Sequence, residues 1–538
     1  MAAASAAACG GRAAPGSGGG SSGGGTSWSK GLTVNTPPAT GDVSKVIWNE
    51  WEGEPPTIDP FHSADYTPNT INSNLCEDLI ALEPNFTFAP QLATSWSYAT
   101  PLSLVINLRK GVTFWDGTEM TSADVAFSLD RNLVDKTSFY NYLFSHVASV
   151  QATGKYQVTI HLSKPDYLLV NELADFAGVV VEKKFWQEHP KTFGSPNVGV
   201  MCTGPYKFTS WTKGQNITIT RYDGYWDKAR MPKVKTIVFT FLTDEASITD
   251  GLVSGQIAGA YDPPVSGLNQ LKAAKNVGKL YYGPSLNDMT FSYSNPTGAM
   301  ASLKLRQALQ EAIDWKGLSS DVMGGTATPI ASFMPPTTFT YAKSELTQAY
   351  NSLPQPVSAA YAAARKLVKQ AGPDAKKPIV MALPSLYTAQ QYCNAVADAA
   401  RRIGLNFTLK VVPTDEYANY LYDPKTRAGV DMLWTDFWPN TPDPLDYIGI
   451  VAVTGGSFNQ WGYTGIDAMY NQAQETKDPI TRGKLVAEMM EKTTKDLLPM
   501  APGITRSSRL WMNNSITGAP ASFDYVYYPW AASLGGTG

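Results

Sequence analysis

The chain is 538 residues long, enough for about three domains, and its 43% hydrophobic and 17% charged residues are typical of a folded chain and exclude a disordered one. A formal net charge of −3 offers no basic surface, so we predict no nucleic-acid partner. Four scattered histidines are too few for a metal cage, and no apolar run reaches the roughly 20 residues of a membrane-spanning helix. We therefore expect no metal and no other cofactor.

The first residues resemble the end of an export signal. Met1 to Cys9 reads MAAASAAAC, and a Gly/Ser tract at 14–27 follows as a flexible tether. Small residues that end in a cysteine resemble the end of a bacterial lipoprotein signal, in which the cysteine is lipidated. Ala6 stands where Leu is usual, and the basic and most of the apolar parts are missing, so we expect that the start codon was assigned too late. We predict a truncated signal and tether at 1–45 with Cys9 as the lipidation site; the alternative is a plain Ala/Gly leader.

Beyond the tether, the pattern indicates a mixed α/β chain. Thr121 stands three residues before Asp124, which is a capping-box spacing, and an apolar helical stripe follows at 125–133. Two further stripes predict helices at 305–313, entered from Ser302, and at 359–371, ended by Gly372. Alternating apolar residues predict strands at 158–162, 217–219 and 405–411.

The sequence contains none of the catalytic motifs that we searched for. It contains no G-x-S-x-G elbow, no Walker loop and no zinc-binding His pair. Cys76, Cys202 and Cys393 lie among apolar neighbours, which is more typical of buried small side chains than of nucleophiles. A Cys76–Cys202 disulfide is possible in an exported protein, but the sequence does not decide it. We predict that the protein is not an enzyme.

An ordered series of segments covers most of the chain between about residues 46 and 518. The segments are PPTIDP (55–60), the run from Pro90 to Arg131, CTGPYKF (202–208), YDGYW (222–226), GLVSGQIAGAY (251–261), LRQALQEAID (305–314), ARRIG (400–404) and PDP (442–444). In order and spacing this series closely resembles extracellular solute-binding protein family 5, the peptide-and-nickel type that serves ABC importers. The long run, TGPY and RQAL…AID are specific, whereas PDP alone would be weak. We expect most of these blocks to have a structural role, because conspicuous Gly and Pro residues usually form turns of the backbone and do not contact ligands.

The resemblance implies an α/β fold of the periplasmic-binding-protein type (type II, cluster C), with two lobes built from three domains and a hinge of two crossover strands. Domain I would comprise 40–81, 197–285 and 500–538. Domain II would be inserted at 82–196, and domain III would form the second lobe at 286–499. The resemblance also implies a monomer outside the cytoplasm, anchored to the cell membrane by its lipid. It would capture a peptide or other small solute and deliver it to the transmembrane subunits of an ABC permease.

The segment MLWTDFWPNTPDPLDY at 432–447 is the candidate ligand-binding segment. In peptide-binding relatives a strand at this place pairs with the extended ligand backbone, and a carboxylate just after it takes the ligand's α-ammonium. Asp436, which follows Trp434 and Thr435, matches that carboxylate by position. The spacing to the PDP block is longer than usual, which makes Asp443 the second candidate. The alternative is that Asp436 only caps a helix or forms a salt bridge.

Other residues bear on the kind of ligand. Gln390 and Gln391 stand where dipeptide-specific relatives carry an Arg that clamps the ligand's carboxylate, which favours a longer peptide. His62 is the one histidine that could reach the cleft, so a nickel chelate is less favoured. We predict oligopeptide binding, with an oligosaccharide as the alternative. Aromatic rings that could cover sugar faces, although core packing is favoured for them, are Trp434, Phe437, Trp438 and Trp461.

Overall fold

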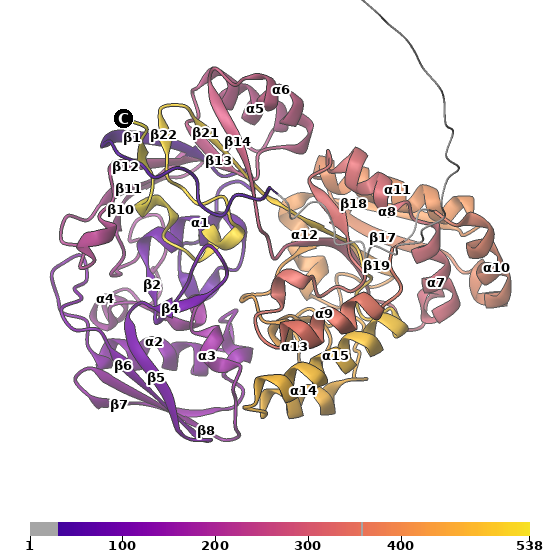
Figure 1. Ribbon diagram of the computed structural model, residues 1–538, viewed down its shortest axis with the longest axis horizontal. Coiled ribbons are helices and arrows are strands. Elements are labelled where there is room, and N and C mark those ends of the chain that lie inside the picture. Colours follow the sequence, from indigo (N-terminus) through magenta and orange to yellow (C-terminus); the bar gives the residue numbers. More distant parts are fainter. Residues whose placement is uncertain (1–30, 357–358) are drawn as a thin grey trace, which may run out of the picture.

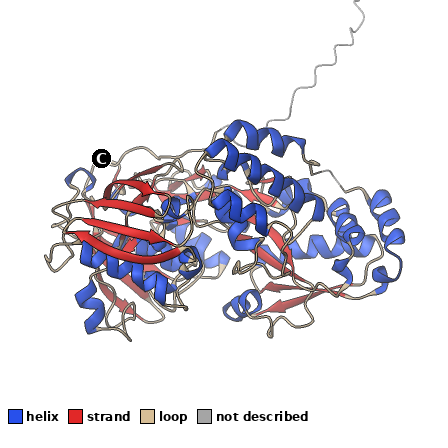
Figure 2. Ribbon diagram, turned by 90° about the horizontal axis from the view of Figure 1, so that it is seen from below, coloured by secondary structure: helices blue, strands red, loops and turns tan. Residues whose placement is uncertain are grey.

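Two large hydrophobic cores divide the molecule into two lobes, which lie side by side in Figures 1 and 2. The computed structural model describes residues 31–356 and 359–538. One core combines side chains of the predicted domains I and II, such as Trp48 and Ile160, and the other combines side chains of domain III, such as Phe291 and Trp315. The predicted α/β fold with two lobes is confirmed. Among the described residues, no helix is both long and apolar enough to cross a bilayer.

A seven-stranded sheet forms the base of the first lobe, in the order β10-β11-β12-β1-β13-β21-β14. β1 runs parallel to both of its neighbours, and the other pairs are antiparallel. The strands are β1 (Val43–Asn49), β10 (Tyr206–Thr212), β11 (Asn216–Arg221), β12 (Val234–Thr240), β13 (Gly259–Tyr261), β14 (Gly278–Gly283) and β21 (Ser508–Asn513), and the helices are α1 (Tyr66–Leu75), α5 (Glu245–Ser254) and α6 (Leu268–Ala273). The short strands β22 (Ile516–Thr517) and β23 (Gly535–Gly536) pair near the C-terminus.

The inserted segment adds a four-stranded antiparallel sheet, β5-β6-β8-β7, to the first lobe, and α2 packs on it. Two short ladders, β2 with β9 and β3 with β4, complete this part of the lobe. The elements are β2 (Glu77–Asp78), β3 (Ile80–Leu82), β4 (Phe88–Pro90), β5 (Ala93–Thr100), β6 (Ser103–Leu108), β7 (Val147–Gly154), β8 (Gln157–Leu162), β9 (Val179–Val180), α2 (Ser122–Val134), α3 (Leu169–Glu172) and α4 (Lys183–Glu188).

The second lobe is built on a six-stranded sheet in the order β16-β20-β15-β19-β17-β18. Its strands are β15 (Asp288–Tyr293), β16 (Ala327–Pro329), β17 (Ile379–Pro384), β18 (Phe407–Val412), β19 (Met432–Phe437) and β20 (Ile504–Arg506). Its helices are α7 (Leu303–Ala312), α8 (Trp315–Gly317), α9 (Lys343–Ser352), α10 (Tyr361–Ala371), α11 (Tyr387–Arg402), α12 (Thr414–Tyr422), α13 (Pro444–Val451), α14 (Asp467–Gln474) and α15 (Pro479–Asp496).

The chain passes between the lobes twice, and strands lead into both crossings. β14 ends at Gly283 in the first sheet and β15 begins at Asp288 in the second; β20 ends at Arg506 in the second sheet and β21 begins at Ser508 in the first. β14 pairs with β21 and β15 pairs with β20, so the two crossings lie side by side, as expected of a hinge. The return crossing therefore lies at Ser507, later than the predicted boundary at 500, because β20 completes the second sheet.

The N-terminal segment 33–41 belongs to the first lobe, whereas the prediction assigned 1–45 to the signal and tether. The backbone N–H of Thr33 donates to the carbonyl of Tyr282 over 2.7 Å, and Gly41 pairs with Gly536. Local composition did not reveal this pairing because the partners are far apart in the sequence. Cys9 and the Gly/Ser tract lie outside the described residues.

Local signals located several elements correctly. Thr121 and Asp124 form both halves of the capping box that begins α2, and α7 begins directly after Ser302. α10 ends at Gly372, which has a φ of 62°. The predicted strands at 158–162, 217–219 and 405–411 correspond to β8, β11 and β18. Cys76 and Cys202 form a disulfide, and Cys393 is buried.

Two of the recognisable sequence blocks meet at one buried carboxylate, that of Glu77. Thr203 of the TGPY block donates to it over 2.7 Å. Tyr225 and Trp226 of the YDGYW block each donate to it over 2.8 Å. Burial raises the pKa of Glu77, and the three donors act against that rise. These blocks fix the return of the chain from the inserted domain into the first, which is a structural role.

We expect Glu77→Ala to destabilise the protein by about 2 kcal/mol or more, because buried donors lose their acceptor. Thermal unfolding followed by circular dichroism measures this loss. The matched control is Glu188→Ala, which removes an exposed glutamate from α4 and is expected to leave the melting temperature unchanged. Equal melting temperatures for both variants would contradict the role of Glu77.

Candidate ligand-binding cleft

A cavity of about 80 Å³ lies beside the crossing strands, with walls from both lobes. Ligand pockets for small molecules usually measure about 300–1,000 Å³, so this arrangement of the lobes leaves little room for a peptide and a peptide would enter only with the lobes apart. The first lobe lines it with Trp51, Thr243, Glu245, Ile248, Asp262, Pro264, Val265 and Arg509, and the second lobe with Met289, Met323, Leu386, Thr388, Ala389, Trp434, Asp436 and Arg506.

Asp436 lies at the cavity, near the end of β19, with its side chain 13% exposed. One carboxylate oxygen lies 3.1 Å from Arg506 Nε, and the other accepts a hydrogen bond of 3.3 Å from the Tyr66 hydroxyl. Burial raises the pKa of Asp436, and the guanidinium of Arg506 opposes this rise. The sequence left open whether this residue forms a salt bridge or binds ligand; it does form a salt bridge, and it also reaches the cavity.

Arg506 joins carboxylates from the two lobes. Besides Asp436 of the second lobe, it contacts Asp262 of the first lobe, with 2.8 Å between Nη1 and Oδ1. Its side chain is 2% exposed, so both ion pairs are shielded from water. Burial alone would raise the pKa of Asp262, but Arg506 and Arg509 outweigh it and hold that pKa below its ordinary value. One buried cation at the hinge thus neutralises an acid on each side.

A further carboxylate stands near Asp436 on the first lobe. Glu52 accepts a hydrogen bond of 3.1 Å from the backbone N–H of Thr67. Burial, together with the charges of Asp65 and Asp436, raises the pKa of Glu52 to about 8. This end of the cleft therefore gathers acidic groups from both lobes, an environment that favours a cationic group on a ligand.

The outer half of β19 has one side without a strand partner. β19 pairs with β15 from Met432 to Phe437, but with β17 only at Met432 and Leu433. Among the described strands, none pairs with Trp434 to Phe437 on the β17 side, although the Tyr417 hydroxyl donates to the Trp434 carbonyl over 2.7 Å. The remaining edge runs toward the carboxylate of Asp436.

The predicted aromatic residues divide between the cleft and the core. Trp434 lines the cavity, and the Trp438 ring lies 4.4 Å from the Tyr66 ring of the other lobe, centroid to centroid. Phe437 stacks on Tyr447 inside the second lobe, with centroids 5.2 Å apart. Thr435 is buried in the same strand.

Three predicted residues lie away from this cavity. Asp443 caps α13 by accepting from the N–H of Leu445 over 2.8 Å. Trp461 packs near the guanidinium of Arg306, which lies 5.6 Å from its ring centroid. His62 lies between two aspartates, Asp59 at 3.0 Å and Asp135 at 3.1 Å. The structure therefore brings together Asp436, Trp434 and Trp438, and leaves the other three elsewhere.

The sequence reasoning missed Arg506, Arg509 and the first-lobe residues Tyr66, Trp51 and Asp262. The two arginines stand in the run ITRSSRLWMN, whose residues 504–512 are all buried. The stretch from Thr505 to Arg509 is polar, so the sequence carries no signal that the two arginines are buried against carboxylates. The segment with Gln390 and Gln391 does reach the site, because Leu386, Thr388 and Ala389 at the start of α11 line the cavity.

Two lobes joined by paired crossing strands, with a cavity beside them that both lobes line, define a solute-binding protein of the type II periplasmic fold. The chain matches the family described as bacterial extracellular solute-binding proteins, family 5 (middle), over residues 87–459. It therefore belongs to family 5 of the bacterial extracellular solute-binding proteins. Members of this family are the extracytoplasmic substrate-binding components of ABC importers and are not enzymes.

Relatives show how varied the ligands of this fold are. The glutathione-binding protein GsiB of Salmonella typhimurium is 25% identical over 451 residues, which cover 82% of this chain and 85% of GsiB. The oligopeptide-binding protein AppA of Bacillus subtilis, solved with a nonapeptide, has a TM-score of 0.79 at 17% identity and covers 93% and 100% of the two chains. NikA of Staphylococcus aureus, solved with Ni(L-His)2, has a TM-score of 0.76 at 18% identity, with 90% and 98% covered.

We expect removal of the Arg506 cation at the hinge to lower the free energy of unfolding strongly. Arg506→Gln leaves buried Asp436 without its cation and Asp262 with Arg509 alone, at 3.5 Å, and should destabilise the protein by about 3–5 kcal/mol. The control Arg402→Gln breaks a pair with Asp398 in which both side chains are 57% exposed, and which should contribute about 0–1 kcal/mol. Urea unfolding of both variants measures the difference. If the two variants lost similar amounts, Arg506 would not be the central contact of the hinge.

Proposed function

We propose that this protein is the oligopeptide receptor of an ABC importer. The observation that carries the proposal is the position of Asp436, at the cavity and near the end of a strand whose outer half lacks a partner on one side. An extended peptide backbone can add to such a strand edge, and the nearby carboxylate can take its α-ammonium. Glu52 from the opposite lobe has a pKa raised to about 8, and a cationic group of a ligand at the same end would favour its ionised form. The ligands of GsiB and AppA, glutathione and a nonapeptide, agree with this class.

Arg506 affects the free energy with which Asp436 would bind the ammonium group of a peptide. A charge-assisted bond between an ammonium and a carboxylate contributes about 1.5–3 kcal/mol, more than one neutral backbone hydrogen bond. Asp436 is already paired with Arg506, so an incoming ammonium would share the carboxylate with the guanidinium instead of neutralising a free charge. Asp262 keeps Arg506 paired during this exchange. Binding of the ligand is thus coupled to the group that joins the lobes.

A saccharide receptor is the second candidate, because the indole rings of Trp51 and Trp434 line the cavity from opposite lobes. Flat rings on both sides suit the apolar faces of sugars. A nickel chelate fits less well, since His62, the candidate histidine, is held between two aspartates away from this cavity.

Asp436→Asn is expected to weaken the binding of tri- to pentapeptides by about 10- to 150-fold, the loss that corresponds to 1.5–3 kcal/mol. Titration calorimetry with a defined peptide mixture measures it. N-acetylation of the same peptides should weaken binding to the wild type and have little further effect on the variant, because both changes remove the same contact. Asp223→Asn, at an aspartate whose side chain is 80% exposed, is the matched control.

Equal affinities of wild type and Asp436→Asn would remove Asp436 from the ligand site. Stabilisation by oligosaccharides in a thermal-shift assay, with no response to any peptide, would replace the peptide proposal by the saccharide one.

We also propose that the receptor works as a monomer anchored through a lipid on Cys9. The support is the small-residue run before Cys9 and the Gly/Ser tract after it, which would let the lobes reach a permease from the membrane surface. Metabolic labelling with a fatty-acid analogue should mark the wild type in the membrane fraction, whereas Cys9→Ser should be unlabelled. A labelled Cys9→Ser protein would refute the assignment of the anchor to this residue.

A further inference from the structure

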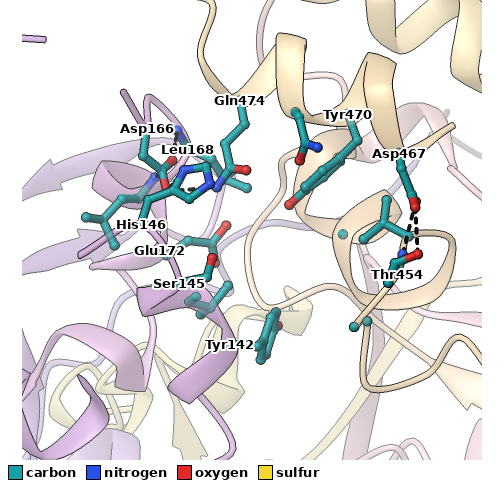
Figure 3. Close-up of a pocket in the computed structure, with 17 residues that line it drawn as sticks. Tyr142, Ser145, His146, Asp166, Leu168, Glu172, Thr454, Asp467, Tyr470 and Gln474 are labelled. Carbon is teal, nitrogen blue, oxygen red and sulfur yellow. Dashed lines mark hydrogen bonds and ion pairs between the residues drawn. The ribbon is translucent and has the colours of Figure 1, made fainter. Parts of the chain in front are cut away.

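The lobes also meet far from the hinge, where the inserted domain faces α13, α14 and α15. A cavity of about 260 Å³ lies there, with Tyr142 and Glu172 on the inserted domain and Tyr470 and Gln474 on the second lobe, as Figure 3 shows. The contact is closed by hydrogen bonds between the lobes. Asn171 donates to Asp443 over 3.0 Å, and Gln474 donates to Asp166 over 2.8 Å.

Four buried carboxylates, here called the acidic cluster, come together at this contact from both lobes. Glu172 and Asp175 belong to the inserted domain, and Asp443 and Asp446 belong to the second lobe. Each of these four residues is no more than 1% exposed. Buried carboxylates are expensive when they are charged, unless cations or hydrogen-bond donors compensate them.

Compensation within the acidic cluster is incomplete. Neither carboxylate oxygen of Glu172 has a hydrogen-bond partner among the described residues, and the same holds for one oxygen each of Asp175 and Asp446. Asp443 differs, because it accepts from the N–H of Leu445 and from Asn171 and is attracted by Arg482. The unpartnered oxygens therefore concentrate on Glu172, Asp175 and Asp446.

The groups that face the acidic cluster are mostly acidic or neutral. Asp166 lies beside it, 3.7 Å from His146, and Asp78 of the first domain acts on Asp175. Arg482 is the cation that acts on Asp443. The facing hydroxyls are those of Tyr142, Tyr341, Tyr470 and Tyr527.

These surroundings disfavour ionisation in the closed arrangement. Burial, followed by the charges of Asp446 and Asp175, raises the pKa of Glu172 well above its ordinary value. Burial raises the pKa of Asp446 to about 8, against donation from the N–H of Thr441. When the lobes separate, water reaches the facing surfaces and the carboxylates return toward ordinary pKa values of about 4.

We propose that closure of the two lobes takes up protons at Glu172, Asp175 and Asp446, so that the acidic cluster makes the receptor close more readily in mildly acidic surroundings. Protonation supplies what the closed contact lacks: a neutral carboxyl group can donate to a neighbouring carboxylate, and the like charges vanish. The inference needs only that the lobes open and close, and it does not depend on which solute the cleft binds.

The direction of the pH dependence follows from linkage. The closed form binds more protons, so its stability relative to the open form is fully present below about pH 4 and is lost as the pH rises toward 8. For each proton taken up, the closing equilibrium constant falls tenfold for each unit of pH within that window.

Small-angle X-ray scattering of the ligand-free protein between pH 5.5 and 8.5 tests this proposal, because the radius of gyration separates open from closed lobes. We expect the wild type to become more compact as the pH falls. Glu172→Gln and Asp446→Asn remove a titrating charge from either side of the contact while keeping the side-chain shape. Each single variant should take up fewer protons on closing, so we expect a shallower pH dependence and a smaller radius of gyration at pH 8.5 than in the wild type.

The exposed Glu188→Gln should follow the wild type throughout and controls for a general effect of charge. Circular dichroism at each pH confirms that the variants are folded, and the two neutral variants, on opposite lobes, serve as checks on each other. A wild-type radius of gyration that is independent of pH, or neutral variants with the wild-type pH profile, would overturn the proposal.

Discussion

The two-lobed arrangement depends on the ion pairs that the Arg506 guanidinium forms with both lobes. Arg506 is the last residue of β20, directly before the chain returns to the first lobe at Ser507. It pairs with Asp262 of the first lobe and with Asp436 of the second. Both carboxylates are buried, so neither can lose this partner without a large desolvation cost. The same cation therefore fixes the hinge and sets the charge of the carboxylate that faces the ligand cavity.

This coupling gives a physical picture of how capture and closure are linked. Under the proposed function, a ligand ammonium at Asp436 would share its carboxylate with Arg506, and Arg506 contacts both lobes, so the ligand would act on the group that joins them. At the far end of the interface, the acidic cluster adds a second contact that forms only when the lobes meet. In the mechanism that we propose, one end of the closure responds to ligand and the other to protons, and both contribute to the same open–closed equilibrium.

Local patterns in the sequence predicted the α/β class, and the two-lobed fold came from the resemblance of the ordered blocks to a known family. The capping box at Thr121 and Asp124, the stop at Gly372 and the blocks that converge on Glu77 are all readable from neighbouring residues. The candidate site was only half accessible in this way. Asp436, near the end of its strand, could be named from the resemblance to the family, but Arg506, Tyr66 and Asp262 join it through contacts separated by 70 residues or more. Pairings of that kind leave no trace in a single sequence, and the same reason explains why residues 33–41 were assigned to the tether.

We propose that the cleft captures oligopeptides, and native mass spectrometry of the receptor purified from its own cells tests this proposal most directly. We expect a bound population that dissociates on denaturation into peptides longer than two residues with free amino termini. Bound oligosaccharides or metal chelates in place of peptides would contradict it.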